Sequence, residues 1–436
     1  MVDDLLLIFM LSNIDHSVNM STSTVQVIAK QSRVAARQLS ATSESQRNLA
    51  LSNMADSLAA VKQQILEVNA QEVAKAKENG QSAAMIKRLT IDDKVFQYML
   101  ARLRKVAQRP DPINRILEGH TNPAGLKVYK KSVSLGVIGI IYESRPNVTT
   151  DAAGVCIKSG NAVILRGGSE SLQTNTLLTD AMIKGAVDAG LPQHAIQIIR
   201  IPGHEAVGEL LKMDEYVDVL IPRGGKDLIR RIAGGTRIPV IKHYDGICHL
   251  YLAKDADPVQ AVELAINSKC QSVQVCNALE TLLVDKKCAE QLLPLLQAAF
   301  KTNNIELRGC EQTQKILQEI TLATEEDWHT EYLAPILSVK IVSGIEKAID
   351  HINNYGSGHT DGIVTQNLNK AQIFEQQVDS ASVLINASTR LSGGGDYGLG
   401  SVVGISTDKL HARGPVGPDE LTTYKWVVYG NGHLRN

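Results

Sequence analysis

The sequence predicts an α/β protein built around mostly parallel sheets with helices on both faces. From residue 147 to residue 300, strand-like apolar runs alternate with helix-like segments, which is the rhythm of βαβ units. A chain of 436 residues is too long for one compact core, so two or three domains are expected. The composition, 44% hydrophobic and 21% charged, supplies enough apolar surface for such cores.

The first part of the chain is predicted to be helical. Apolar residues from Leu58 to Val68 repeat at spacings of three and four, and this helix is expected to stop at Gly80. A second helix is expected to begin after Thr90, with acidic residues in its first turn, and to break at Pro110. Both helices are expected to pack on a sheet.

Strand-like runs follow. Those at residues 126–133 and 135–142 are close enough to predict a hairpin, after which the chain turns at residues 144–147. Two of the helices that come next are expected to end at Gly160 and Gly190. Three others are expected to span residues 205–212, 259–267 and 288–300. Strands are expected between them at residues 162–165, 196–201, 217–221, 247–253 and 281–284.

The charge balance argues against nucleic acid and membrane partners. Lys and Arg number 45 against 46 Asp and Glu, and no basic block appears. The apolar run Leu5–Leu11 is too short to span a membrane and follows two acidic residues, unlike a signal peptide. Because Met20 precedes an ordinary helical beginning, we expect residues 1–19 to be an upstream extension.

The cysteines favour a reducing compartment. They form no CxxC pair, which argues against a structural zinc site and against a disulfide framework in so large a chain. The eleven histidines show no ligand spacing with carboxylates or thiols, so no metal site is predicted. A cytoplasmic location fits best, and it allows a reactive thiol. The six cysteines are Cys156, Cys248, Cys270, Cys276, Cys288 and Cys310.

Small and polar residues stand at the carboxyl ends of three predicted strands, where open parallel sheets bind ligands. Backbone N–H groups of such turns approach phosphates closely, and an arginine there suits an extra 2′-phosphate. Together they indicate a nucleotide, although each turn alone is more often just a tight turn and no GxGxxG fingerprint is present. The candidate residues are Arg166, Gly167, Gly168, Ser169, Gly203, Arg223, Gly224 and Gly225.

Cys276 is the most informative thiol. It follows a polar loop and precedes a buried strand, a place where a side chain can face a cleft between two domains. The alternative is an inert buried cysteine, which composition cannot exclude. Cys270 is a rival nucleophile, although its place at the end of an amphipathic helix favours a packing role.

Long motifs from about residue 26 to the C-terminus resemble the glutamate-5-semialdehyde dehydrogenases, or gamma-glutamyl phosphate reductases, a branch of the aldehyde dehydrogenase superfamily. The motifs are Tyr142–Asn147, Cys276–Leu283, His351–Ile363, Asn386–Arg390 and His411–Gly417. The resemblance implies NADPH-dependent reduction of glutamyl 5-phosphate, the second step of proline biosynthesis from glutamate. In that reaction the Cys276 thiolate displaces phosphate, and hydride from NADPH reduces the resulting thioester.

The resemblance also implies roles for other residues. Asn147 would donate its side-chain amide to the developing oxyanion, although it would equally make a turn and cap the next helix. Glu331 would hold the nicotinamide ribose, unless it is a solvated carboxylate. His359 lies in a family motif too, but a lone histidine is more often structural. The residues suited to the substrate's carboxylate and amine are Arg145, Asn386, Ser388 and Arg390.

One departure from the hydrolytic aldehyde dehydrogenases is informative. Those enzymes carry a general-base Glu in a Glu-Leu-Gly-Gly run. The corresponding segment of this chain, Ile241–Gly246, contains no Glu. Thioester hydrolysis needs a base to activate water, whereas reduction of an acyl phosphate does not. The lost Glu therefore favours a reductase.

The implied architecture has three parts. A cofactor-binding domain covers residues 20–121 and 137–245, a catalytic domain covers 246–412, and a small β oligomerisation lobe covers 122–136 and 413–436. The open edge of the strand Thr423–Tyr429 calls for a second subunit, so a homodimer or homotetramer is expected, with glutamate 5-kinase as a candidate partner. The rivals are a CoA-acylating dehydrogenase and a non-catalytic binding protein on the same fold.

Overall fold

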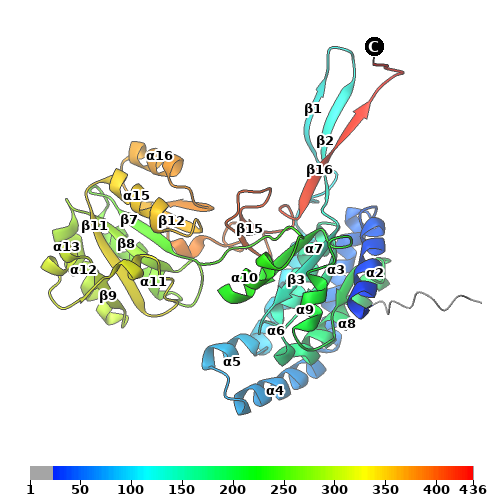
Figure 1. Cartoon of the computed structure of the whole chain (residues 1–436), viewed down its shortest axis with the longest axis horizontal. Coiled ribbons are helices and arrows are strands. Elements are labelled where there is room, and N and C mark those ends of the chain that lie inside the picture. Colours follow the sequence, from blue (N-terminus) through cyan, green and yellow to red (C-terminus); the bar gives the residue numbers. More distant parts are fainter. Residues whose placement is uncertain (1–22, 436) are drawn as a thin grey trace, which may run out of the picture.

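The computed structural model describes residues 23–435, and it divides into two α/β units and a β arm (Figure 1). The expected extension, residues 1–19, lies outside the described residues. The fold class predicted from the alternating pattern is confirmed. Across residues 23–435, no helix is both long enough and apolar enough to cross a membrane.

The first unit contains a four-stranded sheet of order β5-β4-β3-β6, with every pair parallel. Nearly all residues of its strands are buried, because helices cover both faces. The strands are β3 (Val137–Tyr142), β4 (Ala162–Arg166), β5 (Ile196–Ile198) and β6 (Val219–Arg223).

Alternate residues of these strands enter two separate cores. Ile138 and Ile140 face one core, whereas Val137 and Ile141 face the other, as the two-residue period of a strand requires. The first core is completed by α3 (Glu44–Ala60), α6 (Asp93–Ala107), α7 (Asn147–Lys158) and α8 (Leu172–Asp188). The second is completed by α2 (Thr24–Leu39), α9 (Glu205–Leu210) and α10 (Lys226–Gly234).

The predicted first helix is interrupted. Val61 separates α3 from α4 (Lys62–Glu78), and the short α5 (Ala83–Leu89) precedes α6. Ser43, Ser82 and Asp92 cap α3, α5 and α6 with side-chain oxygens that accept backbone N–H groups. The stop at Gly80 and the start after Thr90 agree with the sequence analysis.

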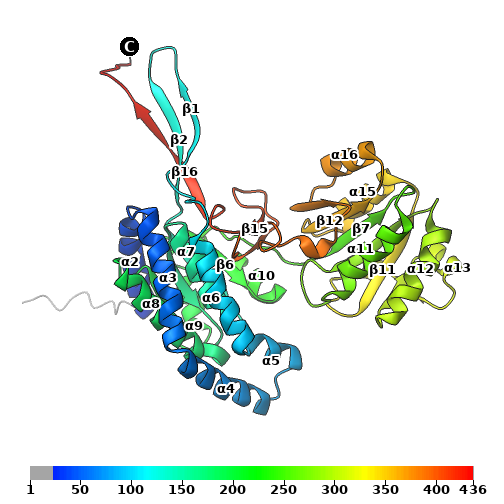
Figure 2. The same cartoon turned by 180° about the vertical axis from the view of Figure 1, so that it is seen from behind.

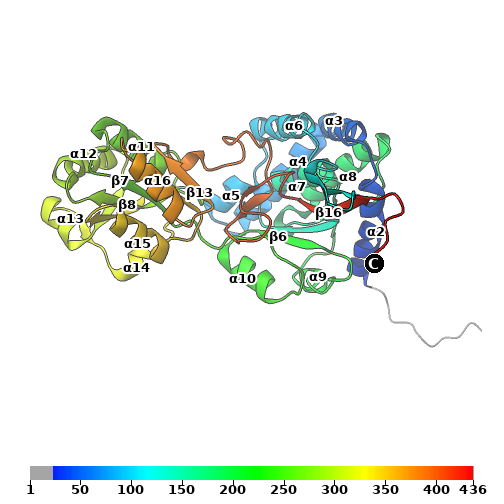
Figure 3. The same cartoon turned by 90° about the horizontal axis from the view of Figure 1, so that it is seen from above.

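The second unit contains a seven-stranded parallel sheet of order β10-β9-β11-β8-β7-β12-β13. Its strands are β7 (Cys248–Leu252), β8 (Leu279–Asp285), β9 (Glu306–Gly309), β10 (Thr321–Leu322), β11 (Ile336–Val342), β12 (Thr360–Val364) and β13 (Ser382–Ile385). Its helices are α11 (Pro258–Cys270), α12 (Ala289–Thr302), α13 (Glu311–Ile316), α14 (Glu325–Trp328), α15 (Ile345–Tyr355) and α16 (Leu368–Gln377). Seen from above, this unit lies beside the first (Figure 3).

An antiparallel arm projects from the first unit (Figure 1). It consists of β1 (Ile116–Thr121), β2 (Lys127–Ser134) and β16 (Thr422–Tyr429), in the order β1-β2-β16. The predicted hairpin between residues 126–133 and 135–142 is wrong, since β2 pairs with β1 and β3 enters the parallel sheet. Residues 116–121 therefore belong to the arm, earlier than the expected limit of 122.

The chain crosses between the units twice. It enters the second unit at about residue 247 and leaves it after a 3-10 turn, η2 (Thr389–Leu391). The returning segment forms the pair β14 (Gly404–Ser406) and β15 (Gly414–Val416), which lies between the units (Figure 2). Val403 and Ala412 pack in the core of the first unit, so the second unit ends before the expected residue 412. The cofactor-binding, catalytic and oligomerisation roles of the three parts remain predictions.

Close packing of α3 against α8 generates a stability prediction. A Cβ added at Gly185 in α8 would lie 2.5 Å from backbone atoms of Asn53, which cannot move aside singly. We expect Gly185→Ala to destabilise the protein by about 1–3 kcal/mol through overpacking. Gly208→Ala is the matched control, because nothing lies within 4 Å of its added Cβ and alanine favours a helix by about 1 kcal/mol.

Both variants are measured by guanidinium chloride unfolding followed by circular dichroism. The midpoint should fall for Gly185→Ala and stay or rise for Gly208→Ala. Equal midpoints for the two variants would contradict the close approach of the helices.

Candidate active site

A cleft of about 1020 Å³ opens between the two units. It is lined on one side by the turns after β3, β4, β5 and β6, and on the other by the loop before β8 and the segment around Arg390. Eleven of the residues singled out from sequence line it. They are Arg145, Arg166, Gly168, Ser169, Gly203, Arg223, Gly224, Gly225, Cys276, Glu331 and Arg390.

Cys276 stands on the loop between α11 and β8, facing this cleft. The Cys248 Sγ donates a hydrogen bond to the Cys276 carbonyl at 3.2 Å. The junction between the units passes so close that a Cβ on Gly246 would lie 2.7 Å from the Cys276 Cα. The loop is therefore held by the strand that begins the second unit.

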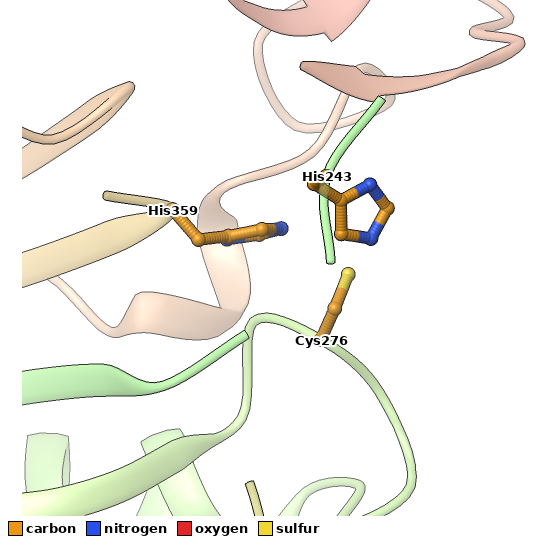
Figure 4. A group of neighbouring side chains, drawn as sticks. All are labelled: His243, Cys276 and His359. Atoms are coloured by element: carbon orange, nitrogen blue, oxygen red, sulfur yellow. The ribbon is translucent and has the colours of Figure 1, made fainter. Parts of the chain in front are cut away.

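His243 meets the Cys276 thiol from the end of the first unit (Figure 4). Burial alone would raise the thiol pKa, but the hydrogen bond to His243, the charge that His243 carries once it holds the thiol proton, and the charge of Arg223 bring it below its usual value. The His243 Nδ1 lies 3.1 Å from the Ile405 carbonyl, which only accepts. Nδ1 therefore carries the proton, and Nε2 is free to take the thiol proton.

Three guanidinium groups lie within electrostatic reach of the Cys276 sulfur. Arg145, Arg223 and Arg390 each have a lower pKa than usual, first because of burial, and each pKa is pushed back up by the Cys276 charge. They come from three separate segments of the chain. Around the thiol they make a strongly cationic environment that stabilises a thiolate and suits an anionic substrate.

The turn that carries Arg145 is built from an unusual backbone conformation. Ser144 has a φ of 39°, in the left-handed region that non-glycine residues rarely adopt. The Glu170 carboxylate stabilises it by accepting from the Ser144 backbone N–H at 2.8 Å and from its hydroxyl at 2.7 Å. This turn directs Arg145 into the cleft, since Arg145 is among the lining residues.

Glu331 and Asn277 tie the neighbouring segments together. Glu331 accepts the Gly246 backbone N–H at 3.0 Å, and burial raises the pKa of its carboxyl. The Asn277 amide donates to the Ser392 carbonyl at 3.0 Å, and its oxygen accepts from Arg390. These bonds attach the segment around Arg390 to Asn277, the residue that follows Cys276.

The glycine turns form the other end of the cleft, and their geometry fits a nucleotide. A Cβ on Gly203 or Gly225 would meet nothing within 4 Å, so both glycines leave room for a ligand beside the backbone. Glu143 accepts the Gly225 N–H at 3.0 Å and fixes the turn. Arg166 is buried and donates to the carbonyls of Gly167 and Gly203, which joins two of the turns.

Four of the residues that the sequence assigned to catalysis, cofactor or substrate do not line the cleft. Asn147 begins α7 rather than capping it, and its amide hydrogen-bonds the Asp151 carboxylate. Gly167 contributes its carbonyl to Arg166. The remaining two, Asn386 and Ser388, bond to the Thr365 backbone and to Ser268 respectively, so their polar groups are engaged inside the second unit.

The rival thiol is less suited to nucleophilic attack. Cys270 lies at the end of α11, packs against the core of the second unit, and has a pKa raised by burial. His359 also lies near Cys276, and burial lowers its pKa to about 4, so its imidazole is neutral at pH 7.

Sequence reasoning missed His243. It stands in the Ile241–Gly246 segment, whose notable feature in the sequence is the missing glutamate, and no spacing relates it to Cys276. Only the close passage of the two backbones at Gly246 brings the imidazole to the thiol.

The chain resembles known proteins over nearly its whole length. The aldehyde dehydrogenase family profile matches residues 12–315 and 316–398. The chain is 38% identical to a gamma-glutamyl phosphate reductase from Thermotoga maritima, over 95% of this chain and 100% of that one, with a TM-score of 0.93. The corresponding protein of Saccharomyces cerevisiae is 32% identical, over 95% and 99%, with a TM-score of 0.53.

A more distant likeness concerns the fold alone. An acetylating aldehyde dehydrogenase from Geobacillus thermoglucosidasius is 18% identical, over 94% of this chain and 97% of that one, with a TM-score of 0.66.

The thiol–imidazole contact predicts the pH dependence of alkylation. His243 favours the charged thiolate, so His243→Asn should raise the pKa of Cys276 and move half-maximal alkylation to higher pH. The measurement is the rate of iodoacetamide modification of Cys276 against pH, read by mass spectrometry. His204→Asn, in the same cleft, is the control and should leave the profile unchanged. Superimposable profiles for wild type and His243→Asn would refute the contact.

Proposed function

The chain belongs to the aldehyde dehydrogenase family, and on that premise we propose that it reduces L-glutamyl 5-phosphate to L-glutamate 5-semialdehyde with NADPH. The relatives from Thermotoga maritima and Saccharomyces cerevisiae, 38% and 32% identical, are both described as gamma-glutamyl phosphate reductases, and they align over nearly their whole length. The reaction is the second step of proline biosynthesis from glutamate, and it makes the protein an oxidoreductase.

The observation that carries the proposal is the convergence of Arg145, Arg223 and Arg390 on the Cys276 thiol. An acyl phosphate with an α-carboxylate brings several negative charges to one carbonyl carbon. Guanidinium groups bind carboxylate and phosphate oxygens through paired N–H donors. We assign Arg145 and Arg390 to the α-carboxylate and Arg223 to the phosphate that leaves.

The first chemical step uses the Cys276–His243 pair. His243 takes the thiol proton at Nε2, and the sulfur attacks the γ-carbonyl carbon of the substrate. A carbon–sulfur bond forms, the bond between the carbonyl carbon and the bridging phosphate oxygen breaks, and inorganic phosphate departs. The Cys276 backbone N–H is the proposed oxyanion donor; an Asn147 donation would require its amide to leave Asp151.

NADPH, when bound, supplies the hydride that reduces the thioester to the aldehyde. The family implies a nicotinamide cofactor, and the choice of NADPH is part of our proposal. The glycine turns after β4, β5 and β6 would hold its phosphates, with Ser169 and Gly224 beside them. Glu331 lines the same cleft as these turns and the thiol, which supports a role in holding the nicotinamide ribose.

The segment before Gly246 lacks the general-base Glu that hydrolytic relatives carry. It offers the His243 imidazole where hydrolytic relatives carry a carboxylate base, and that imidazole is paired with the thiol. The one carboxylate of this segment, Asp245, forms an ion pair with Lys226, so it is not a free base that would activate water.

The arm and the thiols support two further parts of the proposal. Tyr424, Trp426 and Val428 are exposed on β16, whose outer edge has no strand partner within residues 23–435, so we propose that a second subunit pairs there. All six cysteines are free, which supports a reducing cytoplasm. Glutamate 5-kinase, as the source of an unstable acyl phosphate, is the proposed partner enzyme.

The reverse reaction tests the proposed function. With glutamate 5-semialdehyde supplied in its cyclic form, we expect NADPH to appear only when NADP and phosphate are both present. Cys276→Ser should lower this rate at least a thousandfold, because the oxygen nucleophile forms no thioester. Cys270→Ser is the matched control and should retain the rate.

Two outcomes would oppose the proposal. Full activity in Cys276→Ser would dismiss the nucleophile. Activity that requires coenzyme A in place of phosphate would identify a CoA-acylating dehydrogenase instead.

Arg166 generates a separate prediction about the cofactor. If its guanidinium contacts the 2′-phosphate, Arg166→Gln should raise KM about 10–100-fold for NADPH and much less for NADH, since a charge-assisted bond contributes about 1.5–3 kcal/mol. Steady-state kinetics with both cofactors measure the difference. An equal rise for both would show that Arg166 only joins the turns at Gly167 and Gly203.

A further inference from the structure

Three side chains with metal-binding atoms meet at the thiol side of the cleft (Figure 4). The ligand atoms of His243, Cys276 and His359 all lie within 4.8 Å of one another. They come from three segments, namely the junction between the units, the loop before β8 and the start of β12. The spacing of histidines in the sequence predicted no metal site, because these residues are far apart along the chain.

The hydrogen bonds of His359 leave one ring nitrogen without a partner. Its Nδ1 lies 2.8 Å from the Thr360 hydroxyl, and that hydroxyl donates its own hydrogen to Ser392 at 2.8 Å. Nδ1 must therefore carry the proton and donate to Thr360. The opposite nitrogen, Nε2, keeps its lone pair and is buried with no hydrogen-bond partner, while the residue is 1% exposed.

His243 is oriented in the same way. The Ile405 carbonyl accepts from its Nδ1, so its Nε2 also carries a lone pair, on the side of the Cys276 sulfur. The two imidazole rings meet edge to face, with centroids 5.4 Å apart. Metal-binding histidines in proteins are fixed by this same device, a hydrogen bond from the nitrogen that does not bind the metal.

We propose that His243 Nε2, His359 Nε2 and the Cys276 sulfur bind one Zn²⁺ ion, and that zinc bound there reversibly blocks the nucleophile. Two imidazole nitrogens and one thiolate form a three-ligand zinc set that leaves the fourth position open. Ligand atoms around tetrahedral zinc are roughly 3.3–3.6 Å apart, given the Zn–N and Zn–S bond lengths. The three ligand atoms already lie within 4.8 Å of one another, so small side-chain movements would bring them to this spacing.

Zinc bound to the Cys276 sulfur would stop catalysis because it occupies an electron pair of the thiolate. A thiolate that binds zinc shares the lone pair it needs for attack on a carbonyl carbon, and it is shielded from alkylation as well. Arg145, Arg223 and Arg390 oppose a further positive charge, so the ion should leave when a chelator is added. The site would thus act as a reversible stop that requires no oxidation of the thiol.

The test measures binding directly and needs no turnover. Full-length reduced, metal-free protein is titrated with ZnCl₂ by calorimetry, and with Co²⁺ to follow thiolate–cobalt absorption. We expect one ion per chain, with affinity at least about tenfold weaker in His359→Asn and in His243→Asn, since even outer partners of metal ligands are worth about 10–100-fold. Cys276→Ser should abolish the thiolate–cobalt absorption. His204→Asn, in the same cleft but outside the group, should bind as wild type does.

Circular dichroism of each variant guards against misfolding, and His359→Gln provides a second substitution if His359→Asn does not fold. In the reductase assay zinc should inhibit wild type, and a chelator should restore its rate. Absence of zinc binding by wild type would overturn the proposal. Equal binding by wild type and the folded variants at positions 243, 276 and 359 would overturn it too, whatever the substrate of the enzyme proves to be.

Discussion

The close passage of the backbone at Gly246 beside Cys276 is the contact on which the whole site depends. A Cβ on Gly246 would lie 2.6 Å from the Cys276 carbonyl carbon and 2.7 Å from its Cα, so any other residue would force the two segments apart. The Gly246 N–H donates to Glu331, and Cys248 donates to the Cys276 carbonyl. This contact fixes the distance between the Cys276 thiol and the residues of the first unit.

The site is composite because of this contact. The imidazole and two of the guanidinium groups belong to the first unit, whereas the thiol, Arg390 and His359 belong to the second. The Ile405 carbonyl that orients His243 comes from the segment that returns to the first unit. Activation of the thiol therefore depends on the relative position of the two units, and a shift between them would separate His243 and Arg223 from Cys276.

Local patterns predicted those features that depend on local physics. The alternation of strands and helices predicted both parallel sheets, since burial on both faces requires continuous apolar strands. The motif at Cys276 predicted a thiol in a cleft, and the turns after β4, β5 and β6 were correctly expected to share an edge. Such local patterns could not predict which distant segments of the chain pair or touch. The hairpin was misassigned because β1 carries exposed residues at every position and offers no alternation to recognise. His243 was missed because its contact with Cys276 depends on a junction that no periodicity describes.

If Cys276 carries the substrate's acyl group during catalysis, that group can be trapped on its sulfur. Glutamyl phosphate generated in place by a glutamate 5-kinase and ATP would be added to the enzyme without nicotinamide cofactor, followed by acid quench, digestion and mass spectrometry. We expect a glutamyl thioester on the peptide that contains Cys276, and its loss when NADPH is added before the quench. A glutamyl group on Cys270, or aldehyde formation by an enzyme that never acquires the group, would contradict this role of Cys276.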